Sequence, residues 1–256
     1  MKLLITGVKG FIGYHFYNLM AHDPTYNLPG YRLTRPRKIY GIDNCSGLAC
    51  DERDVPYTHG DLMGCELPED VTHVIHLAGR TSVRASWVPE NIGRFYRDNF
   101  LVSERLFDFY KNKPVKILYA TSSSVLEMKS PYAMTKKLVE HIAPPNAIGM
   151  RFFTVFGEKG RPDMLYRMAQ EGRVRHMTEN KRDFTPVEHV VKCIRTLLNK
   201  GNMGEFYEIG TGISRTPKQF LERNTVKVPQ VAYVRKFDES LNTCANVSKM
   251  EALLNQ

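Results

Sequence analysis

Apolar positions along this chain alternate between short continuous runs and longer segments with helical spacing. Short runs rich in β-branched residues predict buried strands at 2–6, 38–42, 73–77, 116–120 and 147–153. Apolar residues recur every three to four positions in the segments that predict helices, at 12–20, 94–110 and 132–142. Because strands and helices take turns, the pattern predicts βαβ units and a parallel sheet.

The rhythm of strands and helices weakens after residue 153. Four further elements are predicted there: helices at 162–171 and 186–198, a strand at 206–209, and a short helix that opens at Thr216-Pro217. We expect residues 1–153 to form the main domain, to which 186–212 returns. We expect residues 154–256 to form a small C-terminal lobe.

The composition indicates a folded globular chain without a membrane span. Of 256 residues, 42% are hydrophobic, which is ample for a buried core. No apolar run reaches about eighteen residues, and the apolar N-terminal stretch is too short for a signal peptide, so we expect a cytoplasmic location. The five cysteines are odd in number and form no C-x-x-C pair, which indicates reduced thiols and no metal site.

The formal net charge of +9 favours an anionic ligand. A nucleotide diphosphate and a nucleic acid both fit that description. The densest basic run, at 32–38, contains Pro36 and lacks interleaved aromatic residues on which bases could stack. Charge alone therefore does not distinguish the two ligands, whereas the sequence motifs do.

The segment 7–13 reads GVKGFIG, a G-x-x-G-x-x-G turn between a predicted strand and a predicted helix. Glycines in such a turn allow a tight bend, a close approach of the backbone to a pyrophosphate, and close packing of helix on strand. The helix that follows presents free N–H groups and a partial positive charge to the phosphates. The turn therefore predicts a dinucleotide-binding, doubly wound α/β fold of the Rossmann type; a glycine-rich structural turn is the alternative.

Asp43 ends the second predicted strand, where a carboxylate accepts hydrogen bonds from the adenosine ribose and repels a 2′-phosphate. This position favours NAD over NADP, although Arg35 and Arg37 nearby leave NADP open, and a surface acid is the alternative interpretation. Asp43 follows Gly13 by 30 residues (43 − 13) instead of about 20. The connection therefore carries an insertion, which we assign to 22–37.

Tyr132 and Lys136 form a Y-x-x-x-K pair on a predicted helix, so the two side chains share one face. Positive charge beside the phenol, from Lys136 and an oxidised nicotinamide, favours the phenolate and lowers a pKa that is ordinarily about 10. Tyr132 is therefore the candidate general base. The segment 121–124 (TSSS) follows a predicted strand, where a hydroxyl can bind a substrate oxygen. The alternatives are a tyrosine that only packs and a polar turn.

With these motifs in order, the chain resembles the extended short-chain dehydrogenases, and among them the NAD-dependent epimerases and dehydratases of nucleotide sugars. The resemblance runs nearly end to end. It is most specific at 151–157 (RFFTVFG) and 160–164 (GRPDM), which are similar to the UDP-glucuronate 4-epimerases. Other matching positions are 60–62 (GDL), 76–79 (HLAG), Asn99, 182–185 (RDFT), Arg235 and 245–249 (ANVSK).

The resemblance implies a role for each matching residue. Tyr132 is the implied base, Lys136 its electrostatic partner, and Ser122 the ligand of the substrate hydroxyl, with Ser123 or Ser124 as alternatives. With Tyr132 and Lys136, the implied NAD-binding residues are Gly7, Gly10, Phe11, Ile12, Gly13, Asp43, Asn44, Asp61, Leu62, Leu77, Ala78, Gly79, Asn99 and Phe152. The implied ligands of the nucleotide sugar are Arg84, Thr154, Arg161, Arg182 and Arg235, of which the last two neutralise the diphosphate.

The implied reaction is epimerisation at C4 of a UDP-hexose or UDP-uronic acid through a transient 4-keto sugar. Three departures from the family bear on the substrate. The segment 125–127 reads VLE in place of Val-Tyr-Gly, Ser122 precedes Tyr132 by only ten positions (132 − 122), and the C-terminal lobe is trimmed. A homodimer formed by the helices at 94–110 and 132–142 is also implied.

Other reactions and another class of protein stay open. A decarboxylase shares the 4-keto intermediate, and a dehydratase or reductase shares the scaffold. Dehydration is disfavoured because Ser122-Ser123 stand where the family's dehydratases place Asp-Glu. A catalytically idle NAD-binding or RNA-binding protein is the alternative from another class, and the Tyr132/Lys136 pair argues against it.

Overall fold

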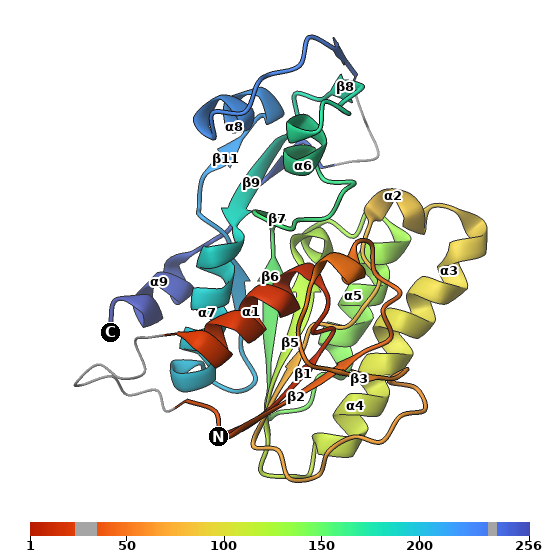
Figure 1. Cartoon of the computed structure of the whole chain (residues 1–256), viewed down its shortest axis with the longest axis vertical. Coiled ribbons are helices and arrows are strands. Elements are labelled where there is room, and N and C mark those ends of the chain that lie inside the picture. The colour runs from red at the N-terminus through yellow and green to blue at the C-terminus, as the bar shows by residue number, and fades with distance from the viewer. Residues whose placement is uncertain (24–34, 235–239) are drawn as a thin grey trace.

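The computed structural model describes residues 1–23, 35–234 and 240–256, so Arg235 and most of the predicted insertion at 22–37 lie outside the described residues. Within them, seven strands form a parallel sheet in the order β10-β6-β5-β4-β1-β2-β3 (Figure 1). The strands are β1 (Lys2–Thr6), β2 (Lys38–Asp43), β3 (Thr58–His59), β4 (His73–His76), β5 (Lys116–Ser122), β6 (Ala147–Phe152) and β10 (Phe206–Ile209). From β1 the strand order runs through β2 to β3 at one edge of the sheet. The chain then crosses to the other side of β1 and continues from β4 to β10 at the opposite edge, which confirms the predicted doubly wound fold.

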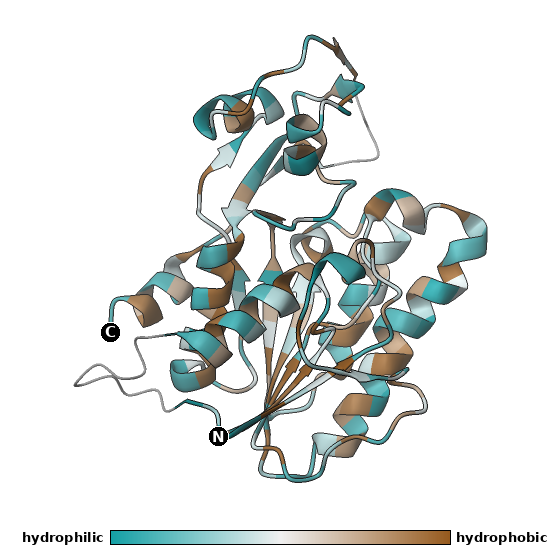
Figure 2. Ribbon diagram, viewed as in Figure 1, coloured by the Kyte–Doolittle hydropathy of each residue, from teal (hydrophilic) through white to brown (hydrophobic). Residues whose placement is uncertain are grey.

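Side chains of the sheet are buried on both faces, as expected for parallel strands covered by helices. In β1, Leu3 and Ile5 join one core cluster and Leu4 joins the other. Figure 2 shows the apolar strands at the centre with helices of mixed polarity around them. On the first face lie α1 (Phe11–His22), α7 (Val187–Lys200) and α9 (Ser248–Leu254), and on the second lie α4 (Val102–Tyr110) and α5 (Pro131–Ile142). The helices α2 (Val83–Ser86) and α3 (Pro89–Phe95) pack against α5. In the described part of the chain, no helix has the length and apolarity needed to cross a bilayer.

The predicted continuous helix at 94–110 is wrong in one respect. The structure has α3, then a π-helical turn at Tyr96–Leu101, then α4. The amide of Val102 donates to the carbonyl of Arg97, five residues back, so the turn holds one extra residue. Apolar spacing cannot reveal this insertion, because the helical repeat resumes on both sides of it. The turn points Asn99 into the interior, where it is fully buried.

The predicted helix at 162–171 is shorter than expected. Only α6 (Leu165–Gln170) is helical, because Arg161 to Met164 form a turn in which the amide of Met164 donates to the carbonyl of Arg161. In contrast, the helix predicted to open at Thr216-Pro217 is present as α8 (Pro217–Arg223), with Thr216 and Gln219 forming a capping box. The strand predicted at 206–209 is β10, which pairs with β6.

The C-terminal lobe contains strands that hydrophobic spacing does not predict. β9 (Lys181–Pro186) is the centre of a small mixed sheet with three other strands, and β8 pairs separately with β12. These strands are β7 (Thr154–Phe156), β8 (His176–Met177), β11 (Ser214–Arg215), β12 (Ala232–Tyr233) and β13 (Asn242–Thr243). The ring of Phe184 stacks on that of Phe220, with centroids 3.9 Å apart. The lobe lies beyond the carboxyl ends of the large sheet (Figure 1).

Candidate active site

The glycine turn occupies the carboxyl end of β1, beside the point where the strand order reverses. Gly7 has φ +70°, and a Cβ there would lie 2.6 Å from the amide nitrogen of Ala78. A Cβ on Gly13 would lie 2.2 Å from the carbonyl oxygen of Gly7. Gly10 caps α1 without a side-chain hydrogen bond, so no side chain covers the first N–H groups. The turn therefore fits an anion such as a pyrophosphate at the helix N-terminus.

The carboxylate of Asp43 lies beside this turn at the end of β2. Its Oδ2 accepts from the amide of Lys9 at 2.9 Å, and its Oδ1 accepts from the amide of Cys45 at 2.7 Å. Asn44 forms the next bend by accepting from the amide of Ser46 at 3.1 Å. The structure therefore brings the predicted ribose ligand and the glycine turn together. Both fit one end of a dinucleotide.

Asp61 and Leu62 lie at the next loop, after β3. The Asp61 carboxylate accepts from the amide of Met63 and pairs with the Arg97 guanidinium, and both contacts lower its pKa. Leu62 is buried. The ion pair joins this loop to the π-helical turn, so the loop is held close to the second face of the sheet.

The phenol of Tyr132 is buried in the first turn of α5, which begins where Ser130 accepts from the amide of Ala133. Burial raises the pKa of Tyr132, whereas a hydrogen bond with Ser122 and the nearby charge of Arg161 oppose that rise. The residues of the chain alone therefore do not produce the predicted lowering of this pKa. The physical reason is that desolvation disfavours the phenolate more strongly than these two groups favour it.

Among the three serines, Ser122 is the one that contacts Tyr132. It is the last residue of β5, and its Oγ lies 3.2 Å from Oγ of Ser124. Ser123 and Ser124 belong to the short 3₁₀ turn that follows. The strand thus orients one hydroxyl toward the phenol and carries the next two residues away along the turn.

The ammonium of Lys136 points to the end of β5 and donates to the carbonyl of Ala120 at 3.1 Å. Its burial lowers the pKa of Lys136 to about 8. A Cβ on Gly79, which has φ +152°, would lie 3.1 Å from Nζ of Lys136 and 2.8 Å from Oδ1 of Asn99. Asn99 in turn donates to Oγ1 of Thr135 at 3.0 Å. Gly79, Asn99 and Lys136 therefore form one compact group.

His76 stabilises this group from the end of β4. Ser103 donates its only hydroxyl proton to the carbonyl of Asn99, so Nε2 of His76 donates to Ser103 at 2.9 Å and Nδ1 accepts from Thr6 at 2.7 Å. Burial lowers the pKa of His76 to about 3, which keeps the imidazole neutral. The histidine cross-links β1, β4 and the helix that carries Asn99.

Arg161 reaches the same region from the C-terminal lobe. Its guanidinium binds both carboxylate oxygens of Asp163 and donates to Oγ1 of Thr81. Its charge acts on the phenol of Tyr132, which brings the two predicted site residues together. Arg161 and Thr154 also line a pocket with four aromatic side chains, Phe156, Tyr166, Phe184 and Phe220.

The other predicted substrate residues are less closely grouped. Arg182 is the second residue of β9, and it donates to the carbonyl of Ser240 at 2.6 Å. Lys129 and Ser240 lower the pKa of Glu127, and the charge of Arg182 lowers it further by a smaller amount. Arg84 is exposed on α2. For the cofactor residues, Leu77 and Ala78 follow β4 beside Gly7, and Phe152 ends β6 in a buried position.

One buried polar group near the site has no counterpart in the sequence predictions. The carboxylate of Glu140 binds the guanidinium of Arg151 through two hydrogen bonds, of 2.9 and 3.0 Å, and accepts from Thr121 at 3.1 Å. These contacts fasten α5 to β5 and β6 next to Ser122. The only local signal was that Glu140 lies one helical turn after Lys136 and shares its face.

Comparison with known proteins agrees with this geometry. The family model described as "NAD dependent epimerase/dehydratase family" matches residues 3–210, and the chain therefore belongs to that family. The predicted dependence on NAD is thereby confirmed at the level of the family, and the glycine turn with Asp43 fits that cofactor.

Individual relatives are similar over most of the chain. An uncharacterized UDP-glucose epimerase of Bacillus subtilis, YtcB, is 27% identical over 295 residues, covering 100% of this chain and 92% of its own. UDP-glucuronate 4-epimerase 2 of Arabidopsis thaliana is 31% identical over 241 residues, covering 77% of this chain and 54% of its own. Among solved structures, MoeE5 in complex with UDP-glucuronic acid and NAD has 25% identity and a TM-score of 0.81, covering 100% of this chain and 93% of its own.

Proposed function

We propose that this protein is an NAD-dependent 4-epimerase of a UDP-hexose or UDP-uronic acid. The observation that carries the proposal is the buried phenol of Tyr132 on α5, a helix that Lys136 fastens to the end of β5 through the carbonyl of Ala120, two residues before Ser122. Ser122 and the charge of Arg161 lower the pKa of this phenol against the effect of burial. These groups meet at the carboxyl edge of the sheet beside the glycine turn. The similarity to UDP-glucuronate 4-epimerase 2 supports the same reaction class.

In the proposed reaction, Tyr132 and Ser122 hold the sugar 4-hydroxyl between them. Bound NAD⁺ supplies a site that accepts the C4 hydride and later returns it. Tyr132 accepts the hydroxyl proton as the C4–O bond becomes a carbonyl, and it returns that proton when the hydride comes back to the opposite face of the sugar. Atoms and electrons therefore balance over one cycle. Lys136, one helical turn along α5, is the proposed electrostatic partner of the phenol.

The positive charge of the arginines indicates which parts of the substrate they bind. We propose that Arg182 and Arg235 bind the diphosphate, and that Thr154 and Arg161 contact the sugar. A guanidinium near the phenol favours a sugar that carries a carboxylate at C6. UDP-glucuronate is therefore our first choice of substrate, ahead of UDP-glucose.

The reaction is tested by incubating the purified protein separately with UDP-glucuronate and UDP-glucose and recording proton NMR spectra. We expect the C4 epimer to accumulate, faster with the uronate. Release of carbon dioxide from UDP-glucuronate would instead assign a decarboxylase, and loss of water would assign a dehydratase. Lack of any product across a set of nucleotide sugars, while NAD stays bound, would refute the proposal.

We also propose a homodimer through the outer face of α3, the π-helical turn and α5. Four large apolar side chains on these adjacent helices are between 40% and 58% exposed: Ile92, Tyr96, Met134 and Leu138. Apolar residues gathered on one face favour burial against a second copy of the same face. The predicted cytoplasmic location stays a prediction.

The dimer is tested by light scattering on the wild type and on the double variant Met134→Glu/Leu138→Glu. We expect a dimer for the wild type and a monomer for the variant, because two buried carboxylates per subunit oppose association. The control Leu241→Glu changes a residue that is 71% exposed on the C-terminal lobe, and it should stay dimeric. A monomeric wild type at micromolar concentration would contradict the proposal.

A further inference from the structure

Arg53 is an unusual buried cation at the edge of the cofactor region. Its side chain is 1% exposed. Nη1 donates to the carbonyls of Lys9 and Leu48, each at 3.2 Å, and Nη2 donates to the carbonyl of Lys159 at 2.7 Å. In the described ranges, Nε has no hydrogen-bond partner and no carboxylate forms an ion pair with the guanidinium. A buried charge without a direct counter-ion is costly, so this arginine calls for an explanation.

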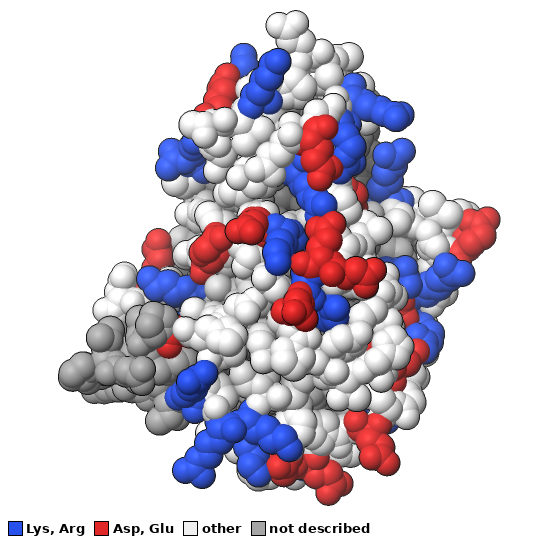
Figure 3. Space-filling model, in the orientation of Figure 1, with Lys and Arg blue, Asp and Glu red and all other residues white. Residues whose placement is uncertain are grey.

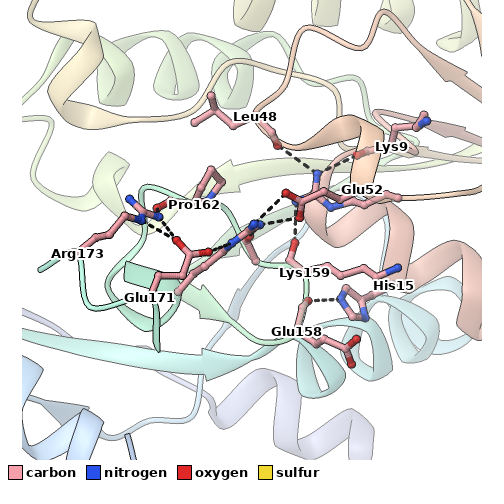
Figure 4. A network of polar contacts seen from close by, with 12 residues as sticks. Lys9, His15, Leu48, Glu52, Glu158, Lys159, Pro162, Glu171 and Arg173 are labelled. Atoms are coloured by element: carbon pink, nitrogen blue, oxygen red, sulfur yellow. Dashed lines mark hydrogen bonds and ion pairs between the residues drawn. The ribbon is translucent and has the colours of Figure 1, made fainter. Parts of the chain in front are cut away.

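The three carbonyls come from three separate parts of the chain. Lys9 belongs to the glycine turn, Leu48 to the loop after Asp43, and Lys159 to the C-terminal lobe. A second bridge lies beside the first: Arg167 of α6 binds both oxygens of Glu52, at 2.7 and 2.8 Å. Figure 4 shows the two bridges together. We call Glu52, Arg53, Lys159 and Arg167 the inter-lobe clasp.

The clasp holds a loop of the C-terminal lobe against α1, at whose N-terminus the glycine turn lies. His15 of α1 donates to the carbonyl of Glu158 at 2.8 Å, and Lys159 donates to the hydroxyl of Tyr14 at 3.0 Å. The neighbouring Gly157 leaves room for Val187 of α7, since a Cβ there would lie 2.6 Å from Cγ1 of that side chain. The loop therefore covers the first turns of the helix that points at the predicted pyrophosphate site.

Charged side chains of both signs meet at the junction of the two parts of the molecule (Figure 3). Arg167 also donates to the carbonyl of Gly160 at 3.1 Å, which ties α6 to the covering loop. The bridge between Glu52 and Arg167 is partly exposed, so it contributes less than its Coulomb attraction suggests. Arg53, with its charge buried, is the stronger part of the clasp.

We propose that the inter-lobe clasp fastens the C-terminal lobe over the glycine turn and slows the release of the dinucleotide, with Arg53 as the main positioning residue. A bound dinucleotide brings negative charge to the glycine turn, which Arg53 contacts through the carbonyl of Lys9. That negative charge offsets the buried positive charge of the Arg53 guanidinium. Cofactor and clasp therefore stabilise each other. The proposal uses the cofactor of the family and does not depend on which sugar is turned over.

The release of NADH from the full-length protein tests this idea. The protein is loaded with NADH, mixed with excess NAD⁺, and followed by the loss of bound-NADH fluorescence. We expect Arg53→Met to release NADH about tenfold faster, which corresponds to about 1.4 kcal/mol. Glu52→Gln and Arg167→Gln should each give about a threefold increase. Arg53→Lys should lie between Arg53→Met and the wild type, because it keeps the charge and loses the fork of donors.

Arg173 supplies a matched control. It binds the carbonyl of Pro162 and Glu171, which also accepts from Arg167. All these contacts stay within the C-terminal lobe and leave both inter-lobe bridges in place, so Arg173→Gln should release NADH at the wild-type rate. Hydrogen exchange adds a second readout: loop 157–160 should exchange faster in the clasp variants and in wild type stripped of cofactor. A purely structural role for Arg53 would lower the melting temperature and leave NADH release unchanged.

Several outcomes overturn the proposal. One is that all folded clasp variants release NADH at a rate within about twofold of the wild-type rate. Another is equal acceleration in Arg173→Gln. If Arg53→Met does not fold, Glu52→Gln and Arg167→Gln decide alone, because both alter partly exposed side chains. Since NADH release is measured without sugar, failure here leaves the proposed epimerase untouched, and failure of the epimerase leaves the clasp untouched.

Discussion

The large sheet and the C-terminal lobe are stabilised by different forces. The sheet buries apolar side chains in two clusters, one on each face. The lobe has a small apolar cluster and a fully buried carboxylate, Asp183, which accepts from the amides of Thr211, Gly212 and Ala245 at 2.9 to 3.2 Å. Apolar contacts tolerate small shifts, whereas hydrogen bonds depend on direction. The sheet therefore depends on many apolar contacts, each of which can adjust, whereas the lobe depends on one hydrogen-bonded centre with a defined geometry.

The largest effect is expected at Tyr132, the proposed base, on helix α5. Replacing Tyr132 with phenylalanine keeps the buried ring and removes the group that accepts the proton. We expect turnover to fall by about 10²- to 10⁴-fold, while NADH binding and the melting temperature change little. Turnover is measured by NMR and binding by fluorescence. Full activity of the variant would refute the proposed chemistry.

A pair of substitutions compares the two stabilising forces directly. Leu118→Ala in β5 removes a fully buried side chain from the sheet, and we expect the free energy of unfolding to fall by about 3 kcal/mol for the whole molecule. Asp183→Ala leaves the amides of Thr211, Gly212 and Ala245 without their acceptor, and we expect a local loss of about 1 to 3 kcal/mol.

Hydrogen exchange distinguishes the two variants. Leu118→Ala should accelerate exchange throughout the sheet, and Asp183→Ala should accelerate it mainly in the lobe. With the lobe loosened, KM for the nucleotide sugar should rise more than kcat falls. If Asp183→Ala exchanged uniformly faster across the sheet as well, the two regions would not differ as described.

The smallest effect is expected on the free energy of unfolding at acidic pH. The pKa of His76 is about 3 in the folded protein, below its ordinary value of 6.5, so the unfolded chain binds a proton that the folded chain excludes. Stability linked to His76 is thus fully present above pH 6.5 and is lost progressively as the pH falls from 6.5 toward 3. At pH 5 we expect a loss of about 2 kcal/mol. Urea unfolding at pH 7 and pH 5 measures it, and His76→Gln should show a smaller difference.

Much of the sheet and of the site could be predicted from local pattern. Strands β1, β5 and β6 begin where their apolar runs predict, and the glycine turn follows β1 as expected. Tyr132 and Lys136 both lie buried on α5, four residues apart, as the helical spacing predicts. In the lobe the pattern fails for β9, because its buried positions include two polar residues. Asp183 accepts from Thr211, 28 residues away, and Thr185 donates to Asp183.

Three features of the chain were determined by the sequence itself: the alternation of strands and helices, the glycine turn after β1, and the spacing of Tyr132 and Lys136. Each depends on neighbours within a few positions, so periodicity and composition carry it. Only the tertiary structure decided that burial raises the pKa of Tyr132, that a π-helical turn buries Asn99, and that Arg53 joins Lys9 to Lys159. The last contact spans 106 residues. A hydrogen bond between such distant segments leaves no periodic trace, because its geometry exists only after the apolar core has brought the segments together.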